Sequence, residues 1–215
     1  MTEELVLHDY FRSSASYRVR IALNLKGVPY TAAPTSLLAG EQKSDAYRAL
    51  NPQGFVPALE AGEAVVTQSF AIIDWLDRAH PEPRLIPEEP TKRARSIAMA
   101  MAIGCDIHPL NNLRVLKYLT SDLGLREDIR DRWIRHWISE GFAALEVMAA
   151  TAEGPYLGGA TPDVADLFLV PQMYNARRFD VDLTPYPALV AADAAACALD
   201  AFAAAAPERV KPEEH

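Results

Sequence analysis

The chain has 215 residues, half of them hydrophobic, and carries a net charge of −8. This length allows a real core and one or two domains, and the acidic balance argues against nucleic acid or an anionic membrane surface as partner. No apolar run approaches the roughly 20 residues of a membrane span, and the acidic N-terminus lacks the basic start of a signal peptide.

The cysteine content points to a reducing compartment. Cys105 and Cys197 are the only cysteines and lie far apart in the sequence. We expect two ordinary buried thiols in a cytoplasmic protein rather than a disulfide framework. No grouping of His, Cys, Asp and Glu has metal-ligand spacing, so no metal site is expected.

Residues 1–83 predict a small α/β domain. Leu5–Tyr10 is a short run of β-forming residues, and Tyr17–Gly27 has helical spacing with a glycine at its end. The expected elements that follow are an extended piece at 29–34, a helical turn at 45–50, two strands joined by a turn at Gly62–Glu63, and a helix at 70–78.

The stretch 81–90 holds four prolines and predicts a linker, which we place at residues 84–91. It leads to a second domain at 92–215 that we expect to be all helical. Thr91–Asp122 predicts one long amphipathic helix with a kink at Pro109. Asp163–Asp166 resembles a capping box with Asp in place of Glu. The remaining expected helices cover 126–150, 186–199 and 201–206, and the charged tail at 207–215 is expected to fray.

Three hydroxyls, Ser13, Ser14 and Ser16, lie between the first strand and the first helix. A helix start of this kind directs free backbone N–H groups and the positive end of a helix dipole to one point. That point favours an anion, and a thiolate is an anion. The simpler alternative is that Ser13 or Ser14 only caps the helix.

Four segments together resemble the glutathione transferases, and most closely their zeta class, the maleylacetoacetate and maleylpyruvate isomerases. They are residues 11–20, Asn51–Pro52 through Val56–Pro57, Gln68–Ser69 with the residues to 73, and 166–172 with Asn175–Ala176. The resemblance covers essentially the whole chain. It implies an α/β thioredoxin-like N-terminal domain, an all-α C-terminal domain and a homodimer.

One residue departs from the zeta pattern, which usually has two serines followed by cysteine, because Ala15 stands in the place of that cysteine. This argues against chemistry that needs a protein thiol, such as reductive dehalogenation through a mixed disulfide. It leaves chemistry in which glutathione supplies the thiol. Ala15, together with the His and Arg in the segment 105–116, favours the maleylpyruvate branch.

The resemblance implies a glutathione site. The Val56 backbone, beside a cis Pro57, would pair with the cysteinyl part of glutathione, and Gln68 and Ser69 would hold its γ-glutamyl end. Ser13 is the expected hydrogen-bond donor to the sulfur, with Ser14 as support and the Tyr10 hydroxyl as a rival. The other candidate glutathione contacts are His108, Asn112 and Asp106, the last across a dimer.

The implied substrate is a small dicarboxylate with a conjugated cis double bond. Reversible thiolate addition leaves a single bond that can rotate, so glutathione would act as cofactor. Arginine suits both carboxylates and a developing enolate. The candidates are Arg12, Arg114 beside Asn111 on one helix, and Arg178, with Arg177 as the alternative to it; His108 could also act on the enolate.

The sequence therefore predicts a glutathione-dependent cis–trans isomerase that converts maleylpyruvate, or maleylacetoacetate, to the fumaryl isomer in aromatic degradation. One alternative is a general glutathione transferase that conjugates electrophiles such as α-halo acids. The other is a binding module of the same fold without turnover. Retention of Ser13, Ser14, Gln68 and Ser69 argues against the module, and three arginines suited to a dianion favour the isomerase.

Overall fold

The computed structural model describes residues 4–212, and the chain divides into two compact units. The first unit takes in the chain up to Leu85 and also the segment from Ala198 onward, and the second unit is Ile86–Cys197. The second domain that we expected ran from 92 to 215. The C-terminal segment instead packs with the first unit.

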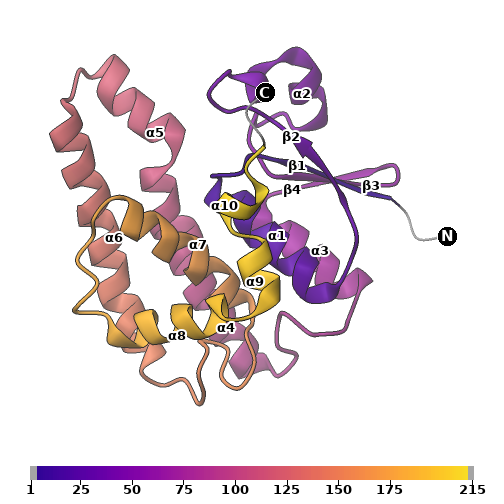
Figure 1. Cartoon of the computed structure of the whole chain (residues 1–215), viewed down its shortest axis with the longest axis vertical. Helices are drawn as coiled ribbons and strands as arrows, with labels where there is room; N and C mark the ends of the chain where they lie inside the picture. Colours follow the sequence, from indigo (N-terminus) through magenta and orange to yellow (C-terminus); the bar gives the residue numbers. More distant parts are fainter. Residues whose placement is uncertain (1–3, 213–215) are drawn as a thin grey trace. The chain divides into compact units, whose positions relative to one another are not determined.

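The first unit is built on a mixed four-stranded sheet with the order β2-β1-β3-β4. Its strands are β1 (Leu5–Asp9), β2 (Thr31–Pro34), β3 (Ala58–Ala61) and β4 (Ala64–Thr67). β1 runs parallel to β2 and antiparallel to β3, and β3 and β4 form a hairpin. Figure 1 shows α1 (Ser14–Lys26) and α3 (Ser69–Ala79) on one face of the sheet and α2 (Asp45–Leu50), next to the 3₁₀ turn Glu41–Lys43, on the other. This is the expected thioredoxin-like fold.

Helices α1 and α3 pack against each other under the sheet. α1 ends at Gly27, whose φ of 60° is the left-handed conformation predicted for the C-terminal glycine. Near that end the buried Lys26 Nζ lies 2.7 Å from Asp77 Oδ1 of α3 and also donates to two backbone carbonyls. A buried ammonium with its donors satisfied in this way ties the two helices together.

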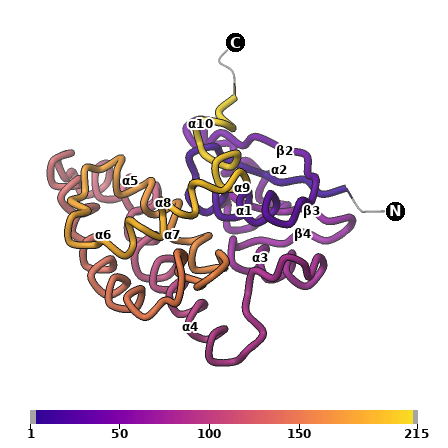
Figure 2. Tube along the Cα trace, turned by 60° about the horizontal axis from the view of Figure 1, so that its bottom comes forward, coloured from indigo at the N-terminus to yellow at the C-terminus, as the bar shows by residue number. Residues whose placement is uncertain are grey.

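The C-terminal segment packs on α1. Arg20 Nε donates to the Ala205 carbonyl and Asn24 Nδ2 to the Ala201 carbonyl, each at 3.0 Å. Figures 1 and 2 show α9 (Asp200–Ala204) and α10 (Pro207–Val210) in yellow beside α1. The expectation that the tail frays from 207 is wrong for α10, and residues 213–215 lie outside the described residues.

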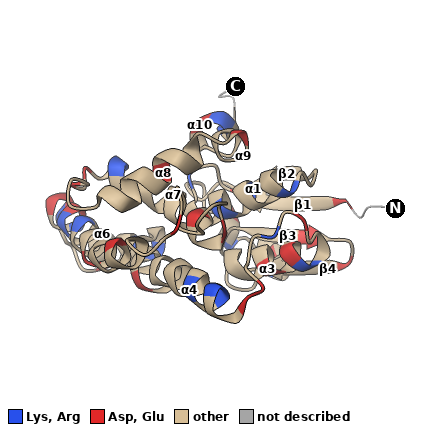
Figure 3. Cartoon of the chain, turned by 90° about the horizontal axis from the view of Figure 1, so that it is seen from below, with Lys and Arg blue, Asp and Glu red and all other residues tan. Residues whose placement is uncertain are grey.

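The second unit is helical, with α4 (Pro90–Met101), α6 (Glu127–Ala149), α7 (Val164–Arg178) and α8 (Pro187–Cys197). α7 is buried from Val164 to Met173 and packs against α4 and α8, so it is the centre of this unit. Gly141 of α6 lets a neighbouring segment come close, because a methyl group at this position would lie 2.3 Å from Ile107 Cδ1. Both acidic and basic residues lie along α6 (Figure 3).

The capping box predicted at Asp163–Asp166 is present. Asp163 accepts a hydrogen bond from the Ala165 N–H and also pairs with Ser96. The Asp166 carboxylate accepts from the N–H groups of Leu157, Gly158 and Asp163 at 2.8–3.0 Å. Burial raises the pKa of Asp166 to about 6, even though these three donors act in the opposite direction.

The single long helix expected over Thr91–Asp122 is wrong. α4 passes into a π-helical turn at Ala102–Ile107 and a 3₁₀ turn at His108–Asn111, and then stops. Asn112 has an extended conformation and caps a new helix, α5 (Leu113–Lys117), which continues as a π-helical turn at Tyr118–Asp122. An asparagine ahead of an apolar run is a local N-cap signal that favours this break.

Both cysteine residues are exposed, which corrects the expectation of two buried thiols. In Cys197 the pKa is nevertheless raised to about 11, because the thiol is partly desolvated and lies beside the Asp193 carboxylate. Within residues 4–212, no helix combines the length and apolar character that crossing a membrane requires.

Candidate functional site

The sheet register brings the candidate residues of the first unit to one edge. His8 of β1 lies opposite Ala58 of β3, and Ala58 lies opposite Thr67 of β4. The end of β1, the start of β3 and the end of β4 therefore lie side by side. The chain leaving β1 leads to Ser13 and Ser14, the residues before β3 are Val56 and Pro57, and those after β4 are Gln68 and Ser69.

Ser13 is the N-cap of α1, as its simpler interpretation predicted. Its Oγ accepts a hydrogen bond from the Ser16 N–H at 3.2 Å, which leaves the hydroxyl proton free to donate elsewhere. Ser14 is the first residue of the helix. Within the described part of the chain, the N–H groups of Ser14 and Ala15 have no hydrogen-bond partner, so two donors and a hydroxyl proton remain at this helix start.

The turn before Ser13 is held by a buried arginine. Arg20 donates from Nη1 to both Asp9 carboxylate oxygens, at 2.7 and 2.9 Å, and from Nη2 to the Phe11 carbonyl at 3.0 Å. The structure shows that it fixes the backbone leading to Ser13.

Arg12 is exposed and lies over two aromatic rings. Its Nη2 donates to the Tyr10 hydroxyl at 3.0 Å, and its guanidinium carbon is 5.1 Å from the centre of the Phe11 ring. These contacts orient the guanidinium without neutralising its charge, because no carboxylate among the described residues pairs with it. The Tyr10 hydroxyl is thus engaged with Arg12.

The loop before Val56 is built by local hydrogen bonds. Asn51 Nδ2 and Tyr47 Oη both donate to the Phe55 carbonyl, at 2.7 and 2.8 Å. Gly54 has a φ of 63°, and a methyl group there would lie 2.9 Å from a backbone oxygen, so glycine is required. The Val56–Pro57 bond is cis, as the resemblance implied. Among residues 4–212, the Val56 backbone makes no hydrogen bond.

Gln68 and Ser69 begin α3 in an unusual conformation. Gln68 has a φ of 69°, which is uncommon for a residue other than glycine and is typical of functional positions. Its side chain makes no capping bond, but donates to Gln53 Oε1 at 2.7 Å. Ser69 is the first residue of α3, and its Oγ accepts a hydrogen bond from Arg18 Nη1 at 3.2 Å.

The candidates in the second unit are separated by the break at Asn112. Asn111 and Arg114 do not share one helix as expected, nor do His108 and Asn112. Asn112 Oδ1 accepts from the Arg114 and Val115 N–H groups, so it is a helix cap. Asp106 and Arg114 are exposed, and His108 is half-buried.

Asn111 is the most informative of these residues. The residue is 8% exposed, yet neither Oδ1 nor Nδ2 has a hydrogen-bond partner among the described residues. The 3₁₀ turn that carries it is fastened to α6 by Trp133 Nε1, which donates to the Leu110 carbonyl at 2.9 Å. A buried amide without a partner indicates a position that a ligand or water completes.

The structure distinguishes the two adjacent arginines at the end of α7. Arg177 Nη2 lies 2.5 Å from Asp193 Oδ2, a carboxylate buried on α8. Arg178 is exposed, and its guanidinium carbon lies 5.1 Å from the centre of the Phe179 ring. Arg177 therefore has a structural ion pair, which favours Arg178 as the residue that is open to an anionic ligand.

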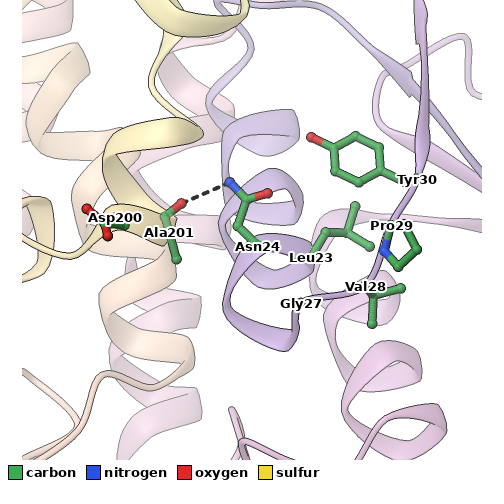
Figure 4. A pocket seen from close by; sticks show the side chains of 8 residues that line it. All are labelled: Leu23, Asn24, Gly27, Val28, Pro29, Tyr30, Asp200 and Ala201. Carbon is green, nitrogen blue, oxygen red and sulfur yellow. Dashed lines mark hydrogen bonds between the residues drawn. The ribbon is translucent and has the colours of Figure 1, made fainter.

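An open hollow of about 660 Å³ lies in the first unit at the C-terminal end of α1 (Figure 4). It is lined by Leu23, Asn24, Gly27, Val28, Pro29, Tyr30, Asp200 and Ala201. None of these is a candidate site residue, and Ser13 begins the other end of the same 13-residue helix. We assign the site to the sheet edge because the free donors lie there.

Comparisons with known proteins identify the family. Residues 12–79 match the family described as the N-terminal domain of glutathione S-transferase. A maleylpyruvate isomerase of a Ralstonia species is 50% identical over 94% of this chain and 96% of its own. The chain belongs to the glutathione S-transferase family.

Two solved structures are similar over nearly the whole chain, and one of them is described as a member of the zeta class. One is a holo structure of maleyl pyruvate isomerase, described as a bacterial zeta-class glutathione S-transferase, with a TM-score of 0.94 and 48% identity over 97% of this chain and all of that one. The other is maleylacetoacetate isomerase from Anaeromyxobacter dehalogenans, with bound dicarboxyethyl glutathione and citrate in its active site. Its TM-score is 0.89, with 40% identity over 100% of this chain and 99% of that one.

Proposed function

We propose that this protein is a glutathione-dependent cis–trans isomerase that converts maleylpyruvate, or maleylacetoacetate, to the fumaryl isomer. The observation that carries the proposal is the start of α1, where a free hydroxyl proton on Ser13 and two free N–H groups meet the positive end of a helix. The similarity to isomerases over nearly the full chain supports it. The Ralstonia relative and Ala15 favour maleylpyruvate as the substrate.

The residues at the sheet edge fit glutathione. Ser13 would donate to the sulfur, with Ser14 in support. The unpaired Val56 backbone, beside cis Pro57, would pair with the extended cysteinyl part. Gln68 and Ser69 would hold the γ-glutamyl end, whose carboxylate suits the N-terminus of α3. When bound, glutathione supplies a thiolate that adds reversibly to the conjugated cis double bond, so that the bond left behind can rotate.

The protein's own task is to recognise a dianion and to stabilise negative charge on its ketone. Arg12 is charged and pre-oriented over aromatic rings, which suits a carboxylate. On the second unit, Arg114 and Arg178 are the proposed carboxylate ligands. Asn111 is proposed as a polar substrate contact because its amide is buried without a partner. His108, Asn112 and Asp106 remain proposed glutathione contacts.

The test is the decay of maleylpyruvate absorbance with and without glutathione, with maleylacetoacetate as the parallel substrate. We expect fast conversion to the fumaryl isomer that needs glutathione but does not consume it. The ratio of the two kcat/KM values then identifies which of the two is the preferred substrate. Net loss of glutathione with an α-halo acid, and no isomerisation, would replace this proposal with a conjugating transferase; glutathione binding without turnover would favour a binding module.

We also propose a homodimer in the cytoplasm, as the family resemblance implies. Sedimentation equilibrium of the full chain tests the dimer, because a mass of one chain at micromolar concentration would exclude it.

A further inference from the structure

Arg18 is a buried cation that reaches the start of another helix. This residue of α1 is 2% exposed, and its Nη1 donates to Ser69 Oγ of α3 at 3.2 Å. An arginine is rarely buried so completely unless its charge is paired or hydrogen-bonded, since desolvating it is costly. The residue it contacts here is a proposed ligand of glutathione.

The direction of this hydrogen bond has a chemical consequence. A guanidinium has donors only, so the Ser69 oxygen must be the acceptor. The Ser69 hydroxyl proton then points away from Arg18 and is left to donate to another group. Ser69 is the first residue of α3, and the preceding Gln68 makes no capping bond, so an acceptor at this helix start would also meet the positive end of the helix.

We propose that Arg18 is a positioning residue for glutathione binding: it turns the Ser69 hydroxyl toward the α-carboxylate of the γ-glutamyl group and adds positive charge behind it. This inference rests on the proposed function in one respect, that Ser69 binds that carboxylate. Arg18 itself does not touch the reacting atoms. Its effect belongs in glutathione affinity and not in the rate of the chemical step.

The experiment compares two ligands by isothermal titration calorimetry. One is glutathione, and the other is 4-aminobutyryl-cysteinyl-glycine, the same tripeptide without the α-carboxylate. The dissociation constant of the shortened ligand divided by that of glutathione measures how strongly the protein recognises that carboxylate. For Arg18→Met we expect the ratio to fall about tenfold, as for one hydrogen bond to a charged group, while the affinity for the shortened ligand stays the same.

Lys26→Met is the matched control, because it also removes a buried cation from α1, but one that contacts Asp77 and backbone carbonyls. We expect it to lower the melting temperature without changing the ratio. If Arg18→Met does not fold, Arg18→Gln, which keeps a polar group but neither charge nor reach, carries the same expectation. At saturating glutathione, the kcat of Arg18→Met should stay within about twofold of the wild type, because only the ground-state binding of glutathione changes.

The Ser69→Ala variant separates the positioning role of Arg18 from the contact between Ser69 and the carboxylate. We expect it to lower the ratio, and we expect the double variant with Arg18→Met to lower it no further, because Arg18 acts through Ser69. Equal weakening of both ligands by Arg18→Met, or additive losses in the double variant, would overturn the role of Arg18 and leave the Ser69 contact standing. A wild-type ratio in Ser69→Ala would instead show that Ser69 does not bind the carboxylate, and would overturn this inference as well.

Discussion

Replacement of Ser13 by alanine removes two different contributions that the structure lets us separate. The first is the cap, because Oγ accepts the Ser16 N–H at 3.2 Å. Loss of an N-cap costs about 1 kcal/mol of stability. In a chain of this size that lowers the melting temperature by about 2–4 °C.

The second contribution is the hydroxyl proton, which the cap geometry leaves free for the glutathione sulfur. A hydrogen bond to a charged group contributes about 1.5–3 kcal/mol, and one pKa unit corresponds to about 1.4 kcal/mol. We therefore expect Ser13→Ala to raise the pKa of the bound thiol by roughly 1–2 units. At neutral pH the isomerase kcat/KM should fall about 10- to 100-fold.

Ser14→Ala is the matched variant. The Ser14 hydroxyl caps nothing and has no hydrogen-bond partner among the described residues, so its loss should leave the melting temperature unchanged and cost less activity. The assay is the ultraviolet absorbance of the bound thiolate as a function of pH, together with the pH profile of the rate. Equal, small losses in both variants, or a lower melting temperature with an unchanged thiol pKa, would refute the donor role of Ser13.

Three further substitutions test other parts of the interpretation. Arg114→Ala should raise the KM for the dicarboxylate about tenfold and leave glutathione affinity nearly intact; reduced glutathione affinity in calorimetry would assign Arg114 to the cofactor site instead. Ala15→Cys should leave isomerisation within about twofold, and a large gain in rate would mean that a protein thiol contributes. Asp166→Ala leaves three backbone N–H groups without their acceptor and should cost about 3–5 kcal/mol in urea unfolding. Because the pKa of Asp166 is raised to about 6 in the folded protein, protonation of this carboxyl group stabilises the native state. The difference in the free energy of unfolding between wild type and Asp166→Ala should be fully present below pH about 4 and should shrink as pH rises through about 6. A difference that grows over this range would contradict the raised pKa of Asp166.

The sequence alone determined the features that depend on neighbours a few residues apart. Gly27 ends α1 because glycine adopts a positive φ readily. Asp163 and Asp166 form the capping box because each carboxylate meets a backbone N–H within three residues. Ser13 caps α1 for the same reason. The resemblance of whole segments to one family supplied the fold and the cofactor.

Tertiary structure alone decided the contacts between residues distant in the sequence. Arg18 and Ser69 are 51 residues apart, and Arg20 and Ala205 are 185 apart. Local pattern carries no information about which buried arginine meets which oxygen, because that depends on how α1 packs against α3 and the C-terminal segment. The ion pair of Arg177 with Asp193, the unpartnered amide of Asn111 and the exposure of the two cysteines also follow from packing. The residue types were visible in the sequence, but their surroundings depend on elements that only the folded chain brings together.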